Sequence, residues 1–229
     1  MSLYDIFRKL HLFVSRNNNS EFFKLVKKIN NINELSEGKT LLYTACQYGN
    51  LEITKYLLSN SANPNILSFG STNLYIATWY NHGNIVSELC KYDVEIDKTN
   101  NGTLFSPLCY AIEREYVDIV KILVASKANL NYMIDGKKTR PLHLACQKRN
   151  FEIIKILIEH NADIHSLDNY NKNPIFYIHN NFSYSKVPEP SSELIEFINS
   201  VLILKKNKNI ITSKLNPNAV EWNQNPAIL

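Results

Sequence analysis

The chain has 229 residues, of which 45% are hydrophobic and 20% are charged, and its formal net charge is +4 at pH 7. This length allows one or two globular domains, and a charge this mild does not by itself argue for nucleic-acid binding. The apolar runs are too short to span a bilayer, and charged residues at Asp5, Arg8 and Lys9 interrupt the N-terminus where a signal peptide needs an apolar core.

The N-terminal segment predicts a pair of short helices, at Leu10–Val14 and Glu21–Lys28. Their apolar residues recur at helical spacing, but the motif that follows further along the chain is missing here. We interpret this pair as the terminal cap of a stacked array, because a terminal unit must turn one face to water.

A motif of two short apolar helices then recurs four times. The first helix of each copy carries a central alanine, and successive alanines are 32, 34 and 34 residues apart: Ala45, Ala77, Ala111 and Ala145. The fourth copy is the clearest, with a first helix within Thr139–Cys146, a second at Phe151–Ile158 and a loop at Asn161–His165. Neither helix could bury its apolar face alone, so the copies are predicted to stack.

This motif resembles the ankyrin repeat, whose core reads T-P-L-H-x-A over about 33 residues. In this core a threonine at the N-cap satisfies free amides at the start of the first helix, and a proline at the first helical position, such as Pro141, has its φ already set. The resemblance implies that His143 hydrogen-bonds backbone between repeats. The copy around Ala77, which is the third repeat when the N-terminal pair is counted as the first, has Asn73 for proline and Tyr75 for histidine, so we expect it to be less regular.

The C-terminal end predicts a sixth, degenerate unit. Asn173–Ile178 begins it, an insertion follows at His179–Pro190, and Ser192–Leu202 forms its second helix. We therefore expect an all-α ankyrin repeat solenoid over residues 1–205 and a disordered tail over 206–229, where apolar periodicity is lost. The basic run Lys205–Lys208 is interpreted as a solvated linker, with a nuclear signal as the alternative.

No catalytic motif is present: the sequence lacks a glycine-rich phosphate loop, H-E-x-x-H and G-x-S-x-G. We expect no enzyme activity, no cofactor and no metal site. The four cysteines show no C-x-x-C spacing and are interpreted as small buried apolar residues: Cys46, Cys90, Cys109 and Cys146.

The ankyrin resemblance implies that a partner protein docks on the concave surface of first helices and hairpin tips. By position this surface includes Tyr48, Trp79, Tyr80, Arg114 and Lys148, together with Gln47, Glu113, Gln147 and the tips Phe69, Phe105, Met133 and Tyr170. Exposed aromatic and arginine side chains are typical interface anchors. The alternative for Trp79 is that it fills space left by the irregular third repeat.

The tail contains a second candidate binding site. Its residues resemble the L-N-x-x-A-x-E-F-x-P peptide that binds the MLLE domain of poly(A)-binding protein, with tryptophan in place of phenylalanine: Leu215, Asn216, Pro217, Ala219, Glu221 and Trp222. The expected final proline is replaced by Gln224. The alternative is a chance match in an asparagine-rich tail.

Two functional hypotheses follow. In the first, the protein is an adaptor whose array binds an unknown protein and whose tail binds poly(A)-binding protein, affecting mRNA translation or stability. In the second, it is an effector or regulator of a protist, parasite or virus, which acts only through the array while the tail is inert. In both we expect a cytoplasmic monomer without a small-molecule substrate, membrane contact or direct nucleic-acid binding.

Overall fold

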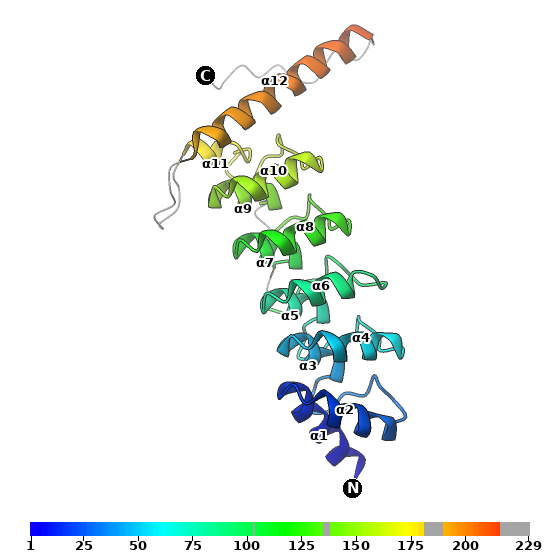
Figure 1. The fold of residues 1–229 in the computed structure, drawn as a ribbon. Coiled ribbons are helices and arrows are strands. Elements are labelled where there is room, and N and C mark those ends of the chain that lie inside the picture. The colour runs from blue at the N-terminus through cyan, green and yellow to red at the C-terminus, as the bar shows by residue number, and fades with distance from the viewer. Residues whose placement is uncertain (103, 135–137, 181–189, 216–229) are drawn as a thin grey trace. The chain divides into compact units, whose positions relative to one another are not determined.

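The computed structural model describes residues 1–102, 104–134, 138–180 and 190–215. The chain forms two compact units, Met1–Val187 and Pro188–Leu229. Figure 1 shows the first unit as helix pairs stacked in chain order. Within the described residues β-structure is limited to isolated bridges, such as Ser36–Lys39 and Ser68–Ser71, in the hairpins between repeats. The predicted all-α repeat fold is therefore confirmed.

Each pair consists of a first and a second helix. The pairs are α1 (Leu3–Ser15) with α2 (Asn19–Leu25), α3 (Leu41–Tyr48) with α4 (Leu51–Ser59), α5 (Asn73–Trp79) with α6 (Gly83–Leu89), α7 (Pro107–Glu113) with α8 (Val117–Ala125), and α9 (Pro141–Lys148) with α10 (Phe151–Glu159). A 3-10 turn, η1 (Val26–Lys28), follows α2, and α11 (Phe176–His179) begins the sixth unit.

The helices of the first unit form two layers. We call α1, α3, α5, α7, α9 and α11 the first-helix layer, because each contacts the next along the stack. The second-helix layer is α2, α4, α6, α8 and α10, and contacts run along it from α4 to α10. The predicted capping pair at the N-terminus is thus present as α1 and α2, and α1 packs directly on α3.

The stacking depends on the alanines that revealed the repeat. All four central alanines are fully buried, and Ile178 is buried at the equivalent position of the sixth unit. A methyl side chain lets neighbouring first helices approach closely, and the apolar stripe of each second helix fills the rest of the core. In α8 this stripe consists of Ile119, Val120, Leu123 and Val124, all buried.

Polar caps fix where the first helices begin. The hydroxyl oxygens of Thr40, Thr72 and Ser106 accept hydrogen bonds from the amides three residues later, at 3.1, 3.0 and 3.3 Å. The repeat around Ala145 departs from the family core, because the residue before Pro141 is Arg140, which is the N-cap and makes no side-chain cap hydrogen bond. Thr139 is separated from the helix by one residue. The Thr139 carbonyl accepts a hydrogen bond from the Ile134 amide at 2.7 Å, within the preceding hairpin.

The third repeat is more regular than predicted in its first helix. Asn73 replaces proline at the first helical position, is fully buried, and donates to the Pro64 carbonyl at 2.7 Å. Tyr75 fills the histidine position and is also buried. The irregularity lies in the second helix, since α6 has 7 residues whereas α4, α8 and α10 have 9 each.

Two glycines allow a matched stability test. Gly70 has a φ of +76°, and a Cβ there would lie 2.8 Å from the Asn101 Cβ, whereas a Cβ on Gly83 in α6 would meet only ordinary contacts. We expect Gly70→Ala to lower the free energy of unfolding by about 1–2 kcal/mol. Gly83→Ala should leave it unchanged or raise it by up to about 1 kcal/mol. Urea unfolding of both variants checks this, and equal effects would contradict it.

The second unit contains α12 (Ser192–Leu215), a helix of 24 residues. The predicted helix, Ser192–Leu202, is its first part, and the helical backbone continues past 205. No glycine or proline interrupts it, whereas Pro217 disfavours helix for the residue before it. The boundary at 205 stays a prediction. The remaining tail-motif residues lie outside the described residues: Asn216, Pro217, Ala219, Glu221 and Trp222.

Candidate protein-binding surface

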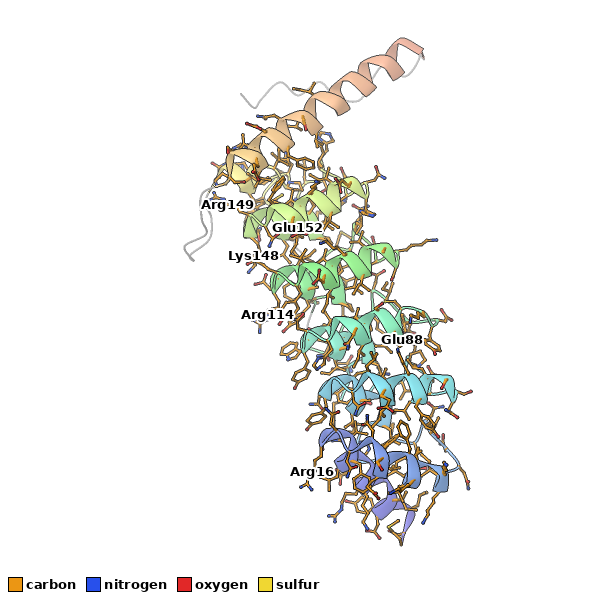
Figure 2. All side chains as sticks on the ribbon, viewed as in Figure 1. Arg16, Glu88, Arg114, Lys148, Arg149 and Glu152 are labelled. Atoms are coloured by element: carbon orange, nitrogen blue, oxygen red, sulfur yellow. The ribbon has the colours of Figure 1, made fainter. Side chains whose placement is uncertain are left out.

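The five predicted array residues occupy equivalent positions in successive repeats. Each is the last residue or C-cap of a first helix: Tyr48 of α3, Trp79 and Tyr80 of α5, Arg114 of α7 and Lys148 of α9. We call the surface formed by these helix ends the first-helix face. Figure 2 shows Arg16, Arg114, Lys148 and Arg149 along the same edge of the stack, opposite Glu88.

The middle of this face is aromatic. Tyr48 is 50% exposed, Trp79 42% and Tyr80 45%. The Trp79 ring stacks on the Tyr110 ring of the next repeat, with centroids 4.7 Å apart and planes 14° from parallel. The Tyr80 hydroxyl accepts from the Gln47 side chain at 3.3 Å. These contacts hold exposed rings in place, which reduces the entropy that a partner must remove on binding.

Trp79 thus packs between repeats on one side and is exposed on the rest, and its role as a binding anchor stays a prediction. Sequence reasoning missed its neighbour Tyr110, which lies next to the central alanine of the following repeat. We expect Trp79→Ala to lower the free energy of unfolding by about 1–2 kcal/mol, because a stacked ring pair is lost. Trp79→Phe should lose less. Thermal unfolding of both variants measures this, and a neutral Trp79→Ala would show that the stack does not stabilise the array.

The end of the face at α7 and α9 carries charges that have partners. The Arg114 Nε donates to the Tyr110 hydroxyl at 3.2 Å, and its guanidinium lies 5.7 Å from that ring centre. Lys148 of α9 forms a 2.6 Å ion pair with Glu113 of α7. Both interactions fix the direction of side chains that the sequence placed on this surface, and the ion pair spans two repeats.

The opposite end of the face, at α1, carries basic side chains that lack ion-pair partners among the described residues. Arg8, Lys9 and Arg16 have no ion-pair partner among the described residues, and the same holds for Lys39 in the neighbouring hairpin. An open depression of about 480 Å³ lies here. It is lined by Arg8, Lys9, His11, Leu12 and Ser15 of α1 with Glu37, Lys39, Thr44 and Tyr48.

His11 is 8% exposed and lines this depression. Its Nδ1 is hydrogen-bonded to the Thr44 hydroxyl at 2.7 Å, and its Nε2 is buried without a partner. Burial, with a smaller contribution from the charge of Lys39, lowers the pKa of His11 to about 4. The imidazole is therefore neutral at pH 7.

Comparison with known families decides the identity of the array. Residues 10–101 and 95–168 match the family model described as ankyrin repeats (3 copies). The chain belongs to the ankyrin repeat family. Ankyrin repeats form a protein–protein interaction module, so the first-helix face is the surface to consider for a partner. In the described part of the chain no helix combines the length and apolarity needed to cross a bilayer.

Relatives support this assignment. FPV230 of Fowlpox virus (strain NVSL), described as an ankyrin repeat protein, is 31% identical over 184 residues, covering 74% of this chain and 90% of that protein. FPV014 of the same virus is 34% identical over 96 residues, and alpha-latrocrustotoxin-Lt1a of Latrodectus tredecimguttatus is 32% identical over 109. The match to FPV014 covers 42% of this chain and 22% of that protein. The match to alpha-latrocrustotoxin-Lt1a covers 47% of this chain and 8% of that protein.

The ankyrin histidine has the role that the resemblance implied. The fully buried His143 Nδ1 accepts from the Arg140 amide at 3.3 Å, so Nε2 carries the proton and donates to the Lys172 carbonyl at 3.1 Å. Lys172 belongs to the next hairpin, where Asp168 accepts from the Lys172 amide and the Tyr177 hydroxyl. His143 thus joins α9 to the sixth unit and leaves no free nitrogen for catalysis.

The other predicted features divide into exposed and buried groups. Among the hairpin tips of the ankyrin array, Phe69, Met133 and Tyr170 are exposed, whereas Phe105 is half-buried. Three of the four cysteines are buried as predicted: Cys46, Cys109 and Cys146. The fourth, Cys90, is half-buried. Burial raises the pKa of the Cys109 thiol to about 12. The described residues contain no group of three or more acidic, histidine or cysteine side chains suited to a metal.

Proposed function

We propose that this chain is a non-enzymatic adaptor whose ankyrin array holds a partner protein on the first-helix face. The observation that carries the proposal is the row of exposed rings, Tyr48, Trp79 and Tyr80, on two consecutive repeats. Aromatic side chains are enriched among the residues that dominate binding energy. Contacts to Gln47 and Tyr110 hold Tyr80 and Trp79 in position before binding.

A pull-down tests this role. The immobilised full-length protein, its Trp79→Ala/Tyr80→Ala variant and a Tyr92→Ala control are compared for captured proteins. Tyr92 is an exposed aromatic residue just beyond the C-terminal end of α6, a helix of the second-helix layer. The double variant should lose the captured partner, and the control should keep it. Capture of the same proteins by all three forms would disprove the role of this face.

The tail supplies a second proposed contact, with the MLLE domain of poly(A)-binding protein. Its support is the sequence register from Leu215 to Trp222. Burying these two side chains would contribute about 2–3 kcal/mol each, polar contacts would add to this, and ordering the segment would cost about 2–5 kcal/mol. Because the cost of ordering offsets much of this gain, we expect micromolar and not nanomolar binding. Tethering both contacts on one chain would raise the effective concentration of each.

A peptide titration tests the tail contact directly. A labelled peptide of residues 210–229 is titrated with an isolated MLLE domain, beside a Leu215→Ala/Trp222→Ala peptide. Saturable binding of the first peptide, at least tenfold weaker for the second, supports the proposal. Absence of binding at tens of micromolar, or equal binding of both peptides, rejects it.

The alternative, a viral or parasite effector that acts through the array alone, is favoured by the two fowlpox relatives. It places the chain in the cytoplasm of a host cell. Comparing the proteins captured by the full chain with those captured by a chain ending at Lys208 distinguishes the adaptor hypothesis from the effector hypothesis. Loss of poly(A)-binding protein on truncation supports the adaptor with two contacts, whereas an unchanged set of partners supports the effector.

A further inference from the structure

The two helix layers of the array differ in charge. The helices of the first-helix layer, with their C-cap residues, carry six basic and two acidic side chains: Arg8, Lys9, Arg16, Arg114, Lys148 and Arg149 against Asp5 and Glu113. Their net charge of +4 equals that of the whole chain. The second-helix layer carries six acidic and four basic side chains, which is a net charge of −2. The two lysines of η1 bring this net charge to zero.

The positive charge of the first-helix face is not uniform along the stack. Four basic side chains without ion-pair partners among the described residues gather at and beside α1: Arg8, Lys9, Arg16 and Lys39. The helices α3 and α5 carry no charged side chain at all and present the exposed aromatic rings. At the α7 end, Lys148 is already paired with Glu113. The face therefore begins with a basic depression and continues as a neutral aromatic surface.

Two acidic side chains lie near the depression, but only Glu37 lines it, against three basic side chains: Arg8, Lys9 and Lys39. Glu37 accepts a hydrogen bond from the Tyr4 hydroxyl at 2.9 Å, and Asp5 caps the start of α1 through Ser2. Neither forms an ion pair with the basic side chains in the described part of the array. A carboxylate supplied by a partner could pair with Arg8 and Lys39, which have no ion-pair partner among the described residues.

We infer that the partner of the first-helix face is an extended acidic peptide segment. Its carboxylates occupy the depression between α1 and α3, and a bulky apolar residue lies on the exposed part of the Trp79 ring. This inference rests on the proposed function and names the chemistry of its partner. The contrast between the two layers would also orient the encounter, because an acidic segment is attracted to the positive first-helix layer and not to the second-helix layer, whose charges nearly cancel.

The spacing within the peptide follows from the repeat. The depression lies between α1 and α3, and the stacked Trp79 and Tyr110 rings lie between α5 and α7. This is two repeats further on, about 16–20 Å for helices packed 8–10 Å apart. An extended chain advances about 3.3 Å per residue. The acidic and apolar residues should therefore be about five or six positions apart.

A nucleic acid fits this face less well. A phosphate backbone places a negative charge at every nucleotide, but α3 and α5 offer no cation to such a chain. A peptide whose charges are confined to one end matches both parts of the surface. We therefore expect a short single-stranded RNA to bind much more weakly than an acidic peptide.

Selection from a random peptide library provides the test. Phage-displayed random 12-residue peptides are selected on the full-length protein, and the most enriched peptide is measured by fluorescence polarisation. We expect enrichment of Asp and Glu, followed about five or six residues away by Trp, Phe or Leu. No enrichment, or enrichment of neutral or basic peptides, overturns the inference. Tighter binding of a single-stranded oligouridylate than of the enriched peptide overturns it as well.

Matched variants locate the binding site. Arg8→Ser/Lys39→Ser should raise the Kd of the enriched peptide about tenfold or more, and Trp79→Ala should also weaken binding. Lys121→Ser, on the second-helix layer, should not change it. Arg8→Glu/Lys39→Glu should instead prefer the peptide with its acids changed to lysine.

An unchanged Kd in Arg8→Ser/Lys39→Ser contradicts the acidic site but leaves the adaptor role intact if Trp79→Ala still weakens binding. The adaptor role itself fails only if the Trp79→Ala/Tyr80→Ala protein captures the same partners as the wild type. The two failures are therefore distinguishable.

Discussion

Leu123→Ala should lower the free energy of unfolding by about 2–5 kcal/mol. Leu123 lies in α8, in the middle of the array, and its side chain is fully buried. Truncation removes the transfer free energy of the lost atoms and leaves a cavity that neighbours fill only in part. Because a domain of this kind is stable by about 5–15 kcal/mol, this single change removes a large fraction of its stability.

Urea unfolding followed by far-UV circular dichroism measures this effect. Leu167→Ala is the matched control, since it deletes the same atoms from an exposed side chain. The control should change the unfolding free energy by no more than about 0.5 kcal/mol. Similar losses in both variants would mean that the α8 stripe is not the core of the array.

Acidification from pH 6.5 to pH 4 should destabilise the array through His11. Its pKa is lowered to about 4 in the folded protein, against about 6.5 in the unfolded chain. Between these values the unfolded state binds more protons, so the free energy of unfolding falls as the pH falls. This loss in the free energy of unfolding amounts to about 3 kcal/mol near pH 4. Above pH 6.5 no loss from His11 is expected.

Chemical unfolding at a series of pH values tests this expectation. His11→Gln removes the titrating group and keeps a side chain able to hydrogen-bond Thr44, so its stability should fall less over this range. His165→Gln, at an exposed loop position, should keep the wild-type slope. Equal slopes in wild type and His11→Gln would show that another group governs the acid response. Burial also lowers the pKa of His143, which acts in the same direction.

The sequence was sufficient to predict the architecture because the alanine spacing is a long-range signal. Ala45, Ala77, Ala111 and Ala145 must face neighbouring helices, and only a stack of equal units satisfies all four at once. Local details were harder. Helix α9 begins at Pro141 with Arg140 as its N-cap, and Thr139 takes the hairpin position that Lys39 and Ser71 occupy in other repeats. The family motif does not state this shift of one residue.

The candidate surface was predicted in position but not in its interactions. Tyr48 and Tyr80 are exposed as the resemblance implied. The stacking of Trp79 on Tyr110 depends on the distance between adjacent repeats, which no sequence spacing states. The difference in charge between the layers was also missed, because counting charges by layer requires knowing which helices lie together.

The stacked ring of Trp79 makes the array a reporter of its own occupancy. The chain has two tryptophans, Trp79 on the first-helix face and Trp222 in the tail. A Trp222→Phe protein therefore has a single tryptophan, which is half-exposed and in contact with Tyr110. A bound partner would remove water from this indole and shift its emission towards the blue. The fraction of protein with a bound partner could then be followed without any label. Quenching of the Trp79 emission by iodide would decrease as this fraction increases.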